Sequence, residues 1–237
     1  MPDPVLEVEG LTAGYGPAEV LFGVDLALRR GEVAALMGRN GAGKSTTLKA
    51  IMGLLPPRSG QVRFLGQDIT GWAPFRIARA GLGYVPEDRR IFTDLTVTEN
   101  LEVGRRVARG GRDAWTPERL FQVFPNLAEM RRRSAAAMSG GEQQMLTIAR
   151  TLMGNPDAVL LDEPSEGLAP VIVEQMAEAV LRMKEEGIAV LLSEQNLDFA
   201  AAVSDRAYVI ERGAIRFQGP VEALEEDEGV RQAYLTV

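Results

Sequence analysis

The stretch GRNGAGKST, residues 38–46, decides the fold of this 237-residue chain. It follows the short apolar run EVAALMG (32–38), which predicts a buried strand, and it leads into KSTTLKAIMG (44–53), which predicts a helix. Glycines allow a tight turn, and the backbone N–H groups at the beginning of a helix attract anions. A strand, a glycine-rich turn and a helix in this order therefore predict a loop that holds phosphate.

We expect different residues of this loop to have different roles in nucleotide binding. Gly38 and the run from Gly43 to Ser45 are spaced as in a nucleotide-binding P-loop. Lys44 would place its charge on the β- and γ-phosphates, and Ser45 would supply a ligand for Mg²⁺. A simple tight turn is the competing interpretation, and the strand and helix on either side disfavour it. The expected nucleotide-binding residues are Gly38, Arg39, Asn40, Gly41, Ala42, Gly43, Lys44, Ser45 and Thr46.

Further apolar runs extend the pattern to an α/β fold. Buried strands are predicted at GLGYV (81–85), AVLLD (158–162) and IAVLLSE (188–194), and the helical stretch VIVEQMAEAVLRMKEEG (171–187) separates the last two. Strands that alternate with helices predict a parallel sheet covered by helices, as in the P-loop NTPases.

The sequence near each end of the chain predicts antiparallel strands. VLEVEGLTAGYG (5–16) alternates like an edge strand, and VDLALRRGEV (24–33) predicts a second strand and a turn, so that an antiparallel β subdomain is expected. ERGAIRFQG (211–219) predicts a hairpin, followed by an acidic helix-like end through Val237.

Residues 87–154 show helix signals without strands. The stretches are TVTENLEVG (96–104), TPERLFQVFPNLAEM (116–130) and GEQQMLTIARTLMG (141–154), with Thr98, Thr116 and Ser139 as expected N-caps. We therefore expect one domain over residues 1–237. Its α/β core with the β subdomain comprises 1–86 and 155–237, and an inserted helical subdomain comprises 87–154, with a flexible hinge at ARGGRDA (108–114).

Composition excludes several classes of function. The absence of cysteine excludes disulfides and thiolate metal sites, and the absence of histidine excludes histidine-based catalysis. A net charge of −7 argues against a nucleic-acid partner held by bulk electrostatics, and the arginine run 131–133 favours a solvated helix end over a nucleic-acid patch. No window is apolar enough to cross a bilayer and the start lacks the pattern of a signal peptide, so we expect a cytoplasmic protein.

Two acids follow a predicted strand in AVLLDEP, residues 158–164. An aspartate at the carboxyl end of a strand beside a P-loop can hold Mg²⁺, directly or through water, which makes Asp162 a candidate ligand. Glu163 would then orient or deprotonate an attacking water. Alone, the Asp-Glu pair is also common in turns, so the prediction depends on the P-loop.

A second anion-binding turn is predicted in MSGGEQQ, residues 138–144. Ser139, Gly140 and Gly141 open a helix whose N–H groups could bind phosphate. An ordinary N-cap with glycines for packing is the other interpretation, and the turn alone favours it.

The order of the motifs overturns that preference. The chain resembles the ATP-binding cassette family over essentially its whole length, because a P-loop is followed in order by VPEDRRIF (85–92), MSGGEQQ and VLLDEP (159–164). The resemblance implies that Tyr15 stacks on adenine, that Asp162 completes the metal shell and that Glu163 is the general base. It also implies that the serine turn, comprising Ser139, Gly140, Gly141 and Glu142, touches the γ-phosphate of an ATP held by a partner subunit.

Three positions depart from the family pattern. Glu87 stands where most members have glutamine, and we place it with the metal ligands. Gln195 stands where a histidine is usual; it can donate a hydrogen bond to the γ-phosphate but cannot become cationic, so slower or more partner-dependent hydrolysis is expected. Asp88 replaces an expected glycine in the loop that meets the membrane subunit in the family.

Within this family, the chain resembles the branch that imports branched-chain amino acids with high affinity. The segments that carry this resemblance are YVPEDRRIF (84–92), MSGGEQQ, SEGLAP (165–170) and SEQN (193–196). This resemblance implies an ATPase at the cytoplasmic face of the membrane, working with ATP and Mg²⁺. The implied partners are a second ATPase subunit, identical or related, transmembrane permease subunits and, indirectly, a periplasmic or extracellular solute-binding protein. No nucleic-acid partner is expected.

Three alternatives stay open at this point. The first is a urea or amide importer ATPase of the same branch. The second is a nucleotide-gated switch with weak hydrolysis, against which the presence of Asp162 and Glu163 argues. The third is a soluble cassette protein of DNA repair or translation, which would need a basic face, long coiled-coil insertions or a second cassette, none of which the sequence contains.

Overall fold

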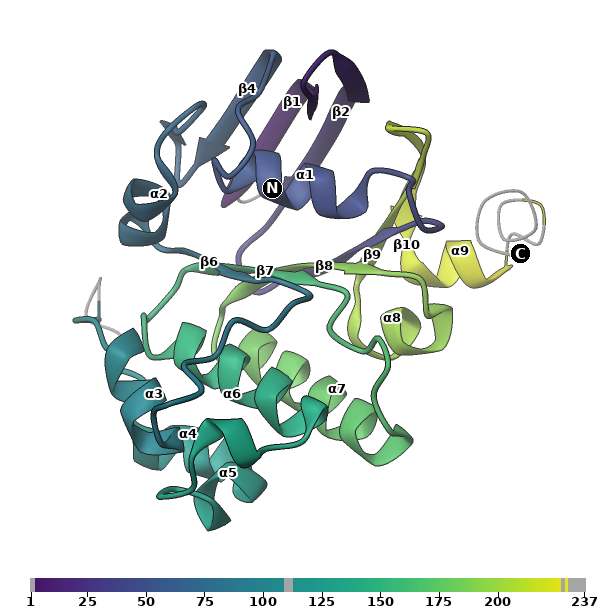
Figure 1. Cartoon of the computed structure of the whole chain (residues 1–237). Coiled ribbons are helices and arrows are strands. Elements are labelled where there is room, and N and C mark those ends of the chain that lie inside the picture. Colours follow the sequence, from purple (N-terminus) through teal and green to yellow (C-terminus); the bar gives the residue numbers. More distant parts are fainter. Residues whose placement is uncertain (1–2, 109–112, 227–228, 230–237) are drawn as a thin grey trace.

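The computed structural model describes residues 3–108, 113–226 and 229, and it contains two sheets (Figure 1). The larger sheet has six strands in the order β10-β9-β3-β8-β7-β6. All neighbours in it are parallel except the hairpin β9–β10. Its strands are β3 (Val33–Met37), β6 (Leu82–Val85), β7 (Ala158–Asp162), β8 (Ala189–Glu194), β9 (Arg206–Glu211) and β10 (Ala214–Pro220). The predicted α/β fold is therefore confirmed.

The smaller sheet is antiparallel, as predicted, with the order β2-β1-β4-β5. Its strands are β1 (Leu6–Tyr15), β2 (Ala18–Leu28), β4 (Ser59–Phe64) and β5 (Gln67–Asp68). The prediction that the first strand lies at an edge is wrong, because β1 pairs with β2 on one side and with β4 on the other. Its alternation reflects one buried face rather than an open edge.

Helix α1 (Lys44–Ile51) lies between the two sheets (Figure 1), where it contacts β1 and β2 as well as β7 and β8. The opposite face of the six-stranded sheet is covered by α6 (Gly140–Leu152), α7 (Pro170–Glu185) and α8 (Leu197–Val203). Strand β3 contributes to the hydrophobic core on each face of the sheet, because its successive side chains point to opposite faces. Ala34 and Leu36 pack on the α1 side, whereas Val33, Ala35 and Met37 pack on the other side.

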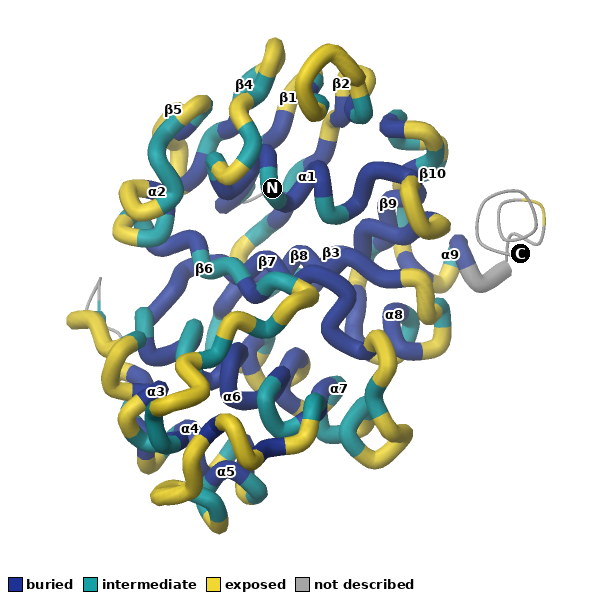
Figure 2. The backbone as a smooth tube through the Cα atoms, in the orientation of Figure 1, coloured by how far each residue is buried: buried dark blue, intermediate teal, exposed yellow. Residues whose placement is uncertain are grey.

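Burial follows from this layering (Figure 2). Every residue of β3, β7 and β8 is buried, which explains why these strands are continuous apolar runs. The carboxyl ends of the three strands meet at one edge, where Met37 pairs with Glu194, and Asp162 pairs with Ser193. Polar residues at this edge are thus brought together by the sheet itself.

The part of the chain between β6 and β7 is helical in its described residues. It contains α3 (Val97–Gly104), α4 (Pro117–Val123), α5 (Pro125–Glu129), a 3₁₀ turn at Ala135–Ala137 and α6. The predicted helix over 116–130 is two helices, because Pro125 restricts the backbone of Phe124 and a new helix begins after it.

The N-cap predictions are right at two of three positions. Thr116 and Ser139 cap α4 and α6. Thr98 is not a cap, because α3 begins two residues earlier than predicted, where Thr96 forms a capping box with Glu99. The Thr98 hydroxyl instead donates to the carbonyl oxygen of Arg131 at 3.0 Å.

A short helix, α2 (Pro74–Ala80), precedes β6, and α9 (Val221–Glu226) follows β10. For the acidic end predicted through Val237, the structure thus describes helix α9 only as far as Glu226. Of the predicted hinge, residues 109–112 lie outside the described residues. The division into subdomains at residues 87 and 154 stays a prediction. None of the described helices has the length and apolar character needed to cross a membrane.

Candidate active site

The loops that follow β3, β6 and β7 border a hollow of ≈ 540 Å³ at the carboxyl edge of the sheet, together with Tyr15 and Val20 of the smaller sheet. Open α/β sheets bind ligands at this edge, and the volume is ordinary for a ligand site. The residues that line the hollow are Tyr15, Val20, Asn40, Gly41, Gly43, Lys44, Ser45, Thr46, Glu87, Glu163 and Glu166. The structure therefore brings together most of the residues that the sequence predicts for one nucleotide.

The glycine-rich loop has the backbone that its sequence requires. Gly43 has φ = 116°, a left-handed conformation that side-chain-bearing residues rarely adopt. A Cβ atom at Gly38 would lie 2.5 Å from the carbonyl oxygen of Ile210, so the loop also needs a glycine where it crosses β9. These two positions allow the chain to turn tightly from β3 into α1.

Lys44 is a buried cation at the beginning of α1, 3% exposed. Its Nζ atom donates to the carbonyl oxygens of Gly38 at 2.7 Å and Arg39 at 3.2 Å, and it forms an ion pair with Glu163 Oε1 at 3.0 Å. The three donors of the buried ammonium group are thus directed to two carbonyl oxygens and one carboxylate. The loop thus presents positive charge to the hollow.

Asp162 is the next charged group along the edge, and it is 1% exposed. Its Oδ1 atom accepts from the hydroxyls of Ser45 at 2.9 Å and Ser193 at 2.8 Å, and its Oδ2 atom accepts from Tyr84 at 3.1 Å. Burial and the Asp162 charge raise the pKa of Tyr84 above its usual range, so the phenol stays a donor. Ser45 and Asp162 thus offer a pair of adjacent oxygen atoms, the ligand type that Mg²⁺ prefers.

Glu163 has a strained backbone. Its φ is 47°, in the left-handed region, and its N–H donates to the Ser193 hydroxyl at 3.0 Å. Strain of this kind persists only where the surroundings hold it, and it is concentrated at functional sites. The conformation turns the side chain toward Lys44 and toward Gln195, whose Nε2 donates to Glu163 Oε2 at 3.3 Å and to Asn40 Oδ1 at 2.8 Å.

Two carboxyl groups in the hollow have opposite pKa shifts. Burial raises the pKa of Glu163, but hydrogen bonds with Glu166, Lys44 and Gln195 and the charge of Lys44 outweigh it and hold this pKa below its usual range. A hydrogen bond with Glu163, desolvation and the Glu163 charge raise the pKa of Glu166 to about 7. Glu163 is therefore the ionised member of the pair at neutral pH, as a proton acceptor must be.

The serine turn lies elsewhere. None of its residues, all within the described chain, lines the hollow around Lys44. Ser139 and Glu142 form a capping box: Ser139 Oγ accepts from the Glu142 N–H at 3.3 Å, and Glu142 Oε2 accepts from the Ser139 N–H at 2.6 Å. A Cβ atom would lie 2.6 Å from the end of the Arg89 side chain at Gly140 and 2.8 Å from the Ile172 side chain at Gly141, so a larger residue requires these side chains to move. The cap is thus present, and contact with phosphate stays a prediction.

Several residues at the site were missed by the sequence interpretation. Tyr84 and Ser193 hold Asp162, Glu166 shares a hydrogen bond with Glu163, and Glu194 accepts from the N–H of Gln195. A signal for two of them was present, because AVLLSE ends in two polar residues just as AVLLDE does.

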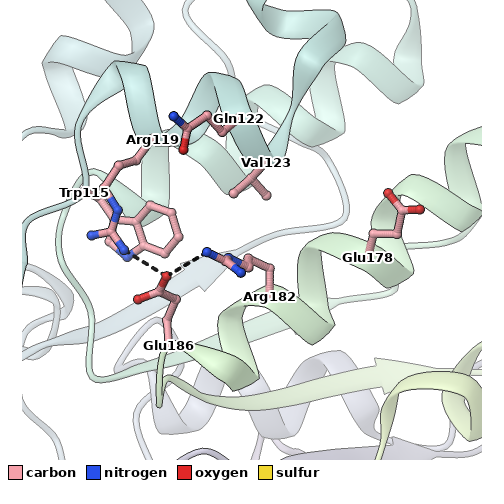
Figure 3. Close-up of a pocket in the computed structure, with 7 residues that line it drawn as sticks. All are labelled: Trp115, Arg119, Gln122, Val123, Glu178, Arg182 and Glu186. Carbon is pink, nitrogen blue, oxygen red and sulfur yellow. Dashed lines mark ion pairs between the residues drawn. The ribbon is translucent and has the colours of Figure 1, made fainter.

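A second hollow, of ≈ 330 Å³, lies between α4 and the end of α7 (Figure 3). Arg119 stacks on the Trp115 ring at 4.6 Å and pairs with Glu186 at 2.9 Å, while Arg182 approaches the same carboxylate at 3.5 Å. The cations thus already have partners, and the network joins α4 to the end of α7. We assign this hollow a packing role.

Comparisons with known proteins agree with this geometry. The sequence profile of the ABC transporter family matches residues 21–166. The chain is 40% identical to the high-affinity branched-chain amino acid transport ATP-binding protein BraG of Pseudomonas aeruginosa, covering 98% of this chain and 99% of BraG. It is 35% identical to the probable branched-chain amino acid transport ATP-binding protein LivF of Archaeoglobus fulgidus, covering 94% and 95%. Among solved structures, the ADP conformation of an ATP-binding cassette of an ABC transporter superposes with a TM-score of 0.82 at 28% identity, covering 98% of both chains.

Proposed function

Because this chain belongs to the ABC transporter family, we propose that it is the ATP-hydrolysing subunit of a membrane importer for branched-chain amino acids. The observation that carries the ATPase assignment is the convergence of Lys44, Ser45 and Glu163 on one hollow at the carboxyl edge of the sheet, where Ser45 bonds to the buried Asp162. The amino-acid assignment is supported by the names of BraG and LivF, each of which spans nearly the same length.

ATP fits the hollow in this proposal. Tyr15 is half-exposed at its border and offers an aromatic face to adenine. The loop from Gly38 to Thr46 surrounds the phosphates with backbone N–H groups, and Lys44 adds its charge. These residues bind and orient the triphosphate without any covalent step, which is how most phosphoryl transfer is catalysed.

Ser45 and Asp162 are the proposed Mg²⁺ ligands, and Glu87 borders the same hollow. When bound, Mg²⁺ would neutralise charge on the phosphate oxygens. In the described residues no cluster of three acidic, histidine or cysteine side chains could hold a metal alone. This agrees with a metal that takes most of its ligands from phosphate and water.

Each of the other side chains at the site has one role in the proposed hydrolysis. A water oxygen forms a bond to the γ-phosphorus, the bond from that phosphorus to the ADP oxygen breaks, and Glu163 takes the proton of the water. Gln195 reaches the same point from the next loop and donates a hydrogen bond to the γ-phosphate. Lys44 stabilises the negative charge throughout.

We infer that two copies, or this chain and a related subunit, complete the site. The serine turn lies away from the hollow in its own chain, yet its N–H groups begin a 13-residue helix, α6, which attracts anions. Ser139, Gly140 and Gly141 would then close over the partner's ATP. Closure on binding and reopening after hydrolysis would supply the movement for transport.

A groove of ≈ 410 Å³ between α2, β6, α3 and α6 is the proposed docking place of the permease. Apolar and arginine side chains line it together, including Leu54, Phe92, Val103, Arg90 and Arg106. The loop that carries Glu87 and Asp88 runs from the nucleotide hollow to this groove, so in this proposal it would transmit movement from one to the other. Docking there places the chain at the cytoplasmic face of the membrane.

The function is tested by co-expression with candidate permease subunits and a related ATPase subunit from the same organism. We expect a membrane complex to copurify and to release phosphate from ATP faster when a loaded solute-binding protein is added. In proteoliposomes the complex should take up leucine, and urea uptake would favour the urea importer instead. A chain that purifies alone and does not hydrolyse ATP in any combination would contradict the proposal.

Replacing Gln195 by histidine should speed hydrolysis by the assembled complex. A cationic donor strengthens a hydrogen bond to phosphate by roughly 1 kcal/mol over a neutral one, which corresponds to about a fivefold increase in rate. The gain should be larger at pH 6 than at pH 8, because a histidine side chain is cationic only below its pKa. Phosphate release from the complex measures both effects, and an unchanged rate at pH 6 would contradict the role given to Gln195.

A further inference from the structure

Glu194 is a buried carboxyl group at the end of β8 for which the proposed reaction has no use. It is 2% exposed, and among the described residues no lysine or arginine forms an ion pair with it. Its partners are the Ser165 side chain and three backbone N–H groups. Oε1 accepts from the N–H of Ser165 at 3.0 Å, and Oε2 accepts from the N–H groups of Gln195 at 3.1 Å and Asn196 at 3.3 Å.

Burying a carboxyl group without a cation is costly, so its retention here calls for a physical reason. Burial holds the pKa of Glu194 above its usual value, and hydrogen bonds from Ser165, Asn196 and Gln195 offset this rise only in part. Core packing alone is better served by an apolar side chain at the end of an apolar strand. The geometry of the two oxygen atoms supplies the reason.

Each oxygen atom of Glu194 holds a different loop. Ser165 lies two residues after Glu163, in the loop that follows β7. Gln195 and Asn196 belong to the loop that follows β8. The side chains that meet over Lys44, those of Glu163 and Gln195, come from these same two loops and lie 3.3 Å apart.

We propose that Glu194 is a positioning residue whose carboxylate fixes the loop of Glu163 against the loop of Gln195. The proposal rests on the proposed ATPase function for its catalytic consequence. Its structural part, the bridge between the two loops, is independent of that function and can be measured separately.

Glu194→Gln is the informative variant, because it preserves size and removes one acceptor. A glutamine side chain has one carbonyl oxygen, and its amide group faces the remaining N–H as a second donor. It can therefore hold the loop after β7 or the loop after β8, but not both.

Glu32→Gln is the matched control. Glu32 is a partly buried carboxylate that likewise accepts from a backbone N–H, that of Arg29 at 2.7 Å, and unlike Glu194 it also pairs with Arg206 at 2.9 Å. It directly precedes β3, so it lies at the opposite edge of the sheet from the hollow. Substitution there should alter neither the loops nor the kinetics.

The bridge is tested first, by hydrogen exchange of the purified protein. In Glu194→Gln we expect faster exchange of the amides of Ser165, or of Gln195 and Asn196, with the P-loop amides unchanged. In Glu32→Gln these amides should exchange as in the wild type. Unchanged exchange at all three amides in Glu194→Gln would overturn the proposal, whatever the ATPase activity of the protein.

The catalytic consequence is tested by steady-state ATP hydrolysis in the assembled complex. Misplacing a reacting group by about 1 Å costs on the order of 10²-fold in rate, so kcat of Glu194→Gln should fall at least about tenfold. KM should stay within about twofold, because Lys44 and the loop that binds the phosphates are untouched. A role limited to stability would lower the melting temperature and leave kcat of the folded protein unchanged, and this result would also overturn the proposal.

Glu194→Asp provides the second variant if glutamine prevents folding. Aspartate keeps the charge but is one methylene shorter. It should therefore keep the hydrogen bonds from the neighbouring Gln195 and Asn196 amides and lose the hydrogen bond from the Ser165 amide. Faster exchange of Ser165 alone with a lowered kcat supports the bridge, and wild-type exchange and kcat contradict it. A wild-type complex without ATPase activity would refute the proposed function, while the exchange result would still decide the bridge.

Discussion

Glu163→Gln should lower ATP hydrolysis about 10²–10⁴-fold while ATP still binds, the range that a positioned general base contributes. Glutamine has the same size but cannot take a proton from water. The pKa of Glu163 lies below its usual range because Glu166, Lys44 and Gln195 bond to its charged form, so the base is ionised at neutral pH and the variant removes it entirely. Lys44 and the loop from Gly38 to Thr46 remain to hold the nucleotide.

Two measurements check this prediction. Phosphate release by the assembled complex gives the loss in rate, and binding of a fluorescent ATP analogue gives the affinity, which should be unchanged or higher. Glu174→Gln, at an exposed position on α7, is the control for loss of one negative charge. Hydrolysis by Glu163→Gln at the wild-type rate would eliminate the general-base role and favour the nucleotide-gated switch.

Residues that are close in sequence were predictable from the sequence. The strand AVLLD coincides with β7 at both ends, and the order strand, glycine loop and helix is that of β3 and α1. These predictions depend on local signals, namely a continuous apolar run and glycines at fixed spacing. The same kind of signal was available for α3, where Thr96 and Glu99 have capping-box spacing and Thr98 does not.

Features that depend on tertiary structure were not predictable. Strand β4 has a weak pattern with two exposed residues at its beginning, and its place in the sheet comes from pairing with β1, some fifty residues earlier. The left-handed backbone of Glu163 is imposed by its bond to Ser193, thirty residues away. The bridge at Glu194 joins two loops that only the sheet brings together.

Lys44→Ala should abolish hydrolysis and weaken ATP binding, because the truncated side chain leaves the triphosphate without its charged donor. A hydrogen bond to a charged group contributes about 1.5–3 kcal/mol, so affinity should fall roughly 10- to 150-fold. The rate should fall about 10²–10³-fold, as on removal of a donor that stabilises the transition state. Nucleotide binding and phosphate release measure the two losses.

The same substitution should also affect stability, and this separates it from a purely catalytic defect. Lys44 and Glu163 are 3% and 8% exposed and lie 3.0 Å apart, so removing the lysine leaves a buried carboxylate that has lost its cation. The free energy of unfolding should fall by about 1.5–3 kcal/mol, the contribution of a hydrogen bond to a charged group. Adding Glu163→Gln to Lys44→Ala removes that charge, so the double variant should be more stable than Lys44→Ala and equally inactive. Equal unfolding free energies for these two variants would show that the ion pair does not act as a unit in the folded chain.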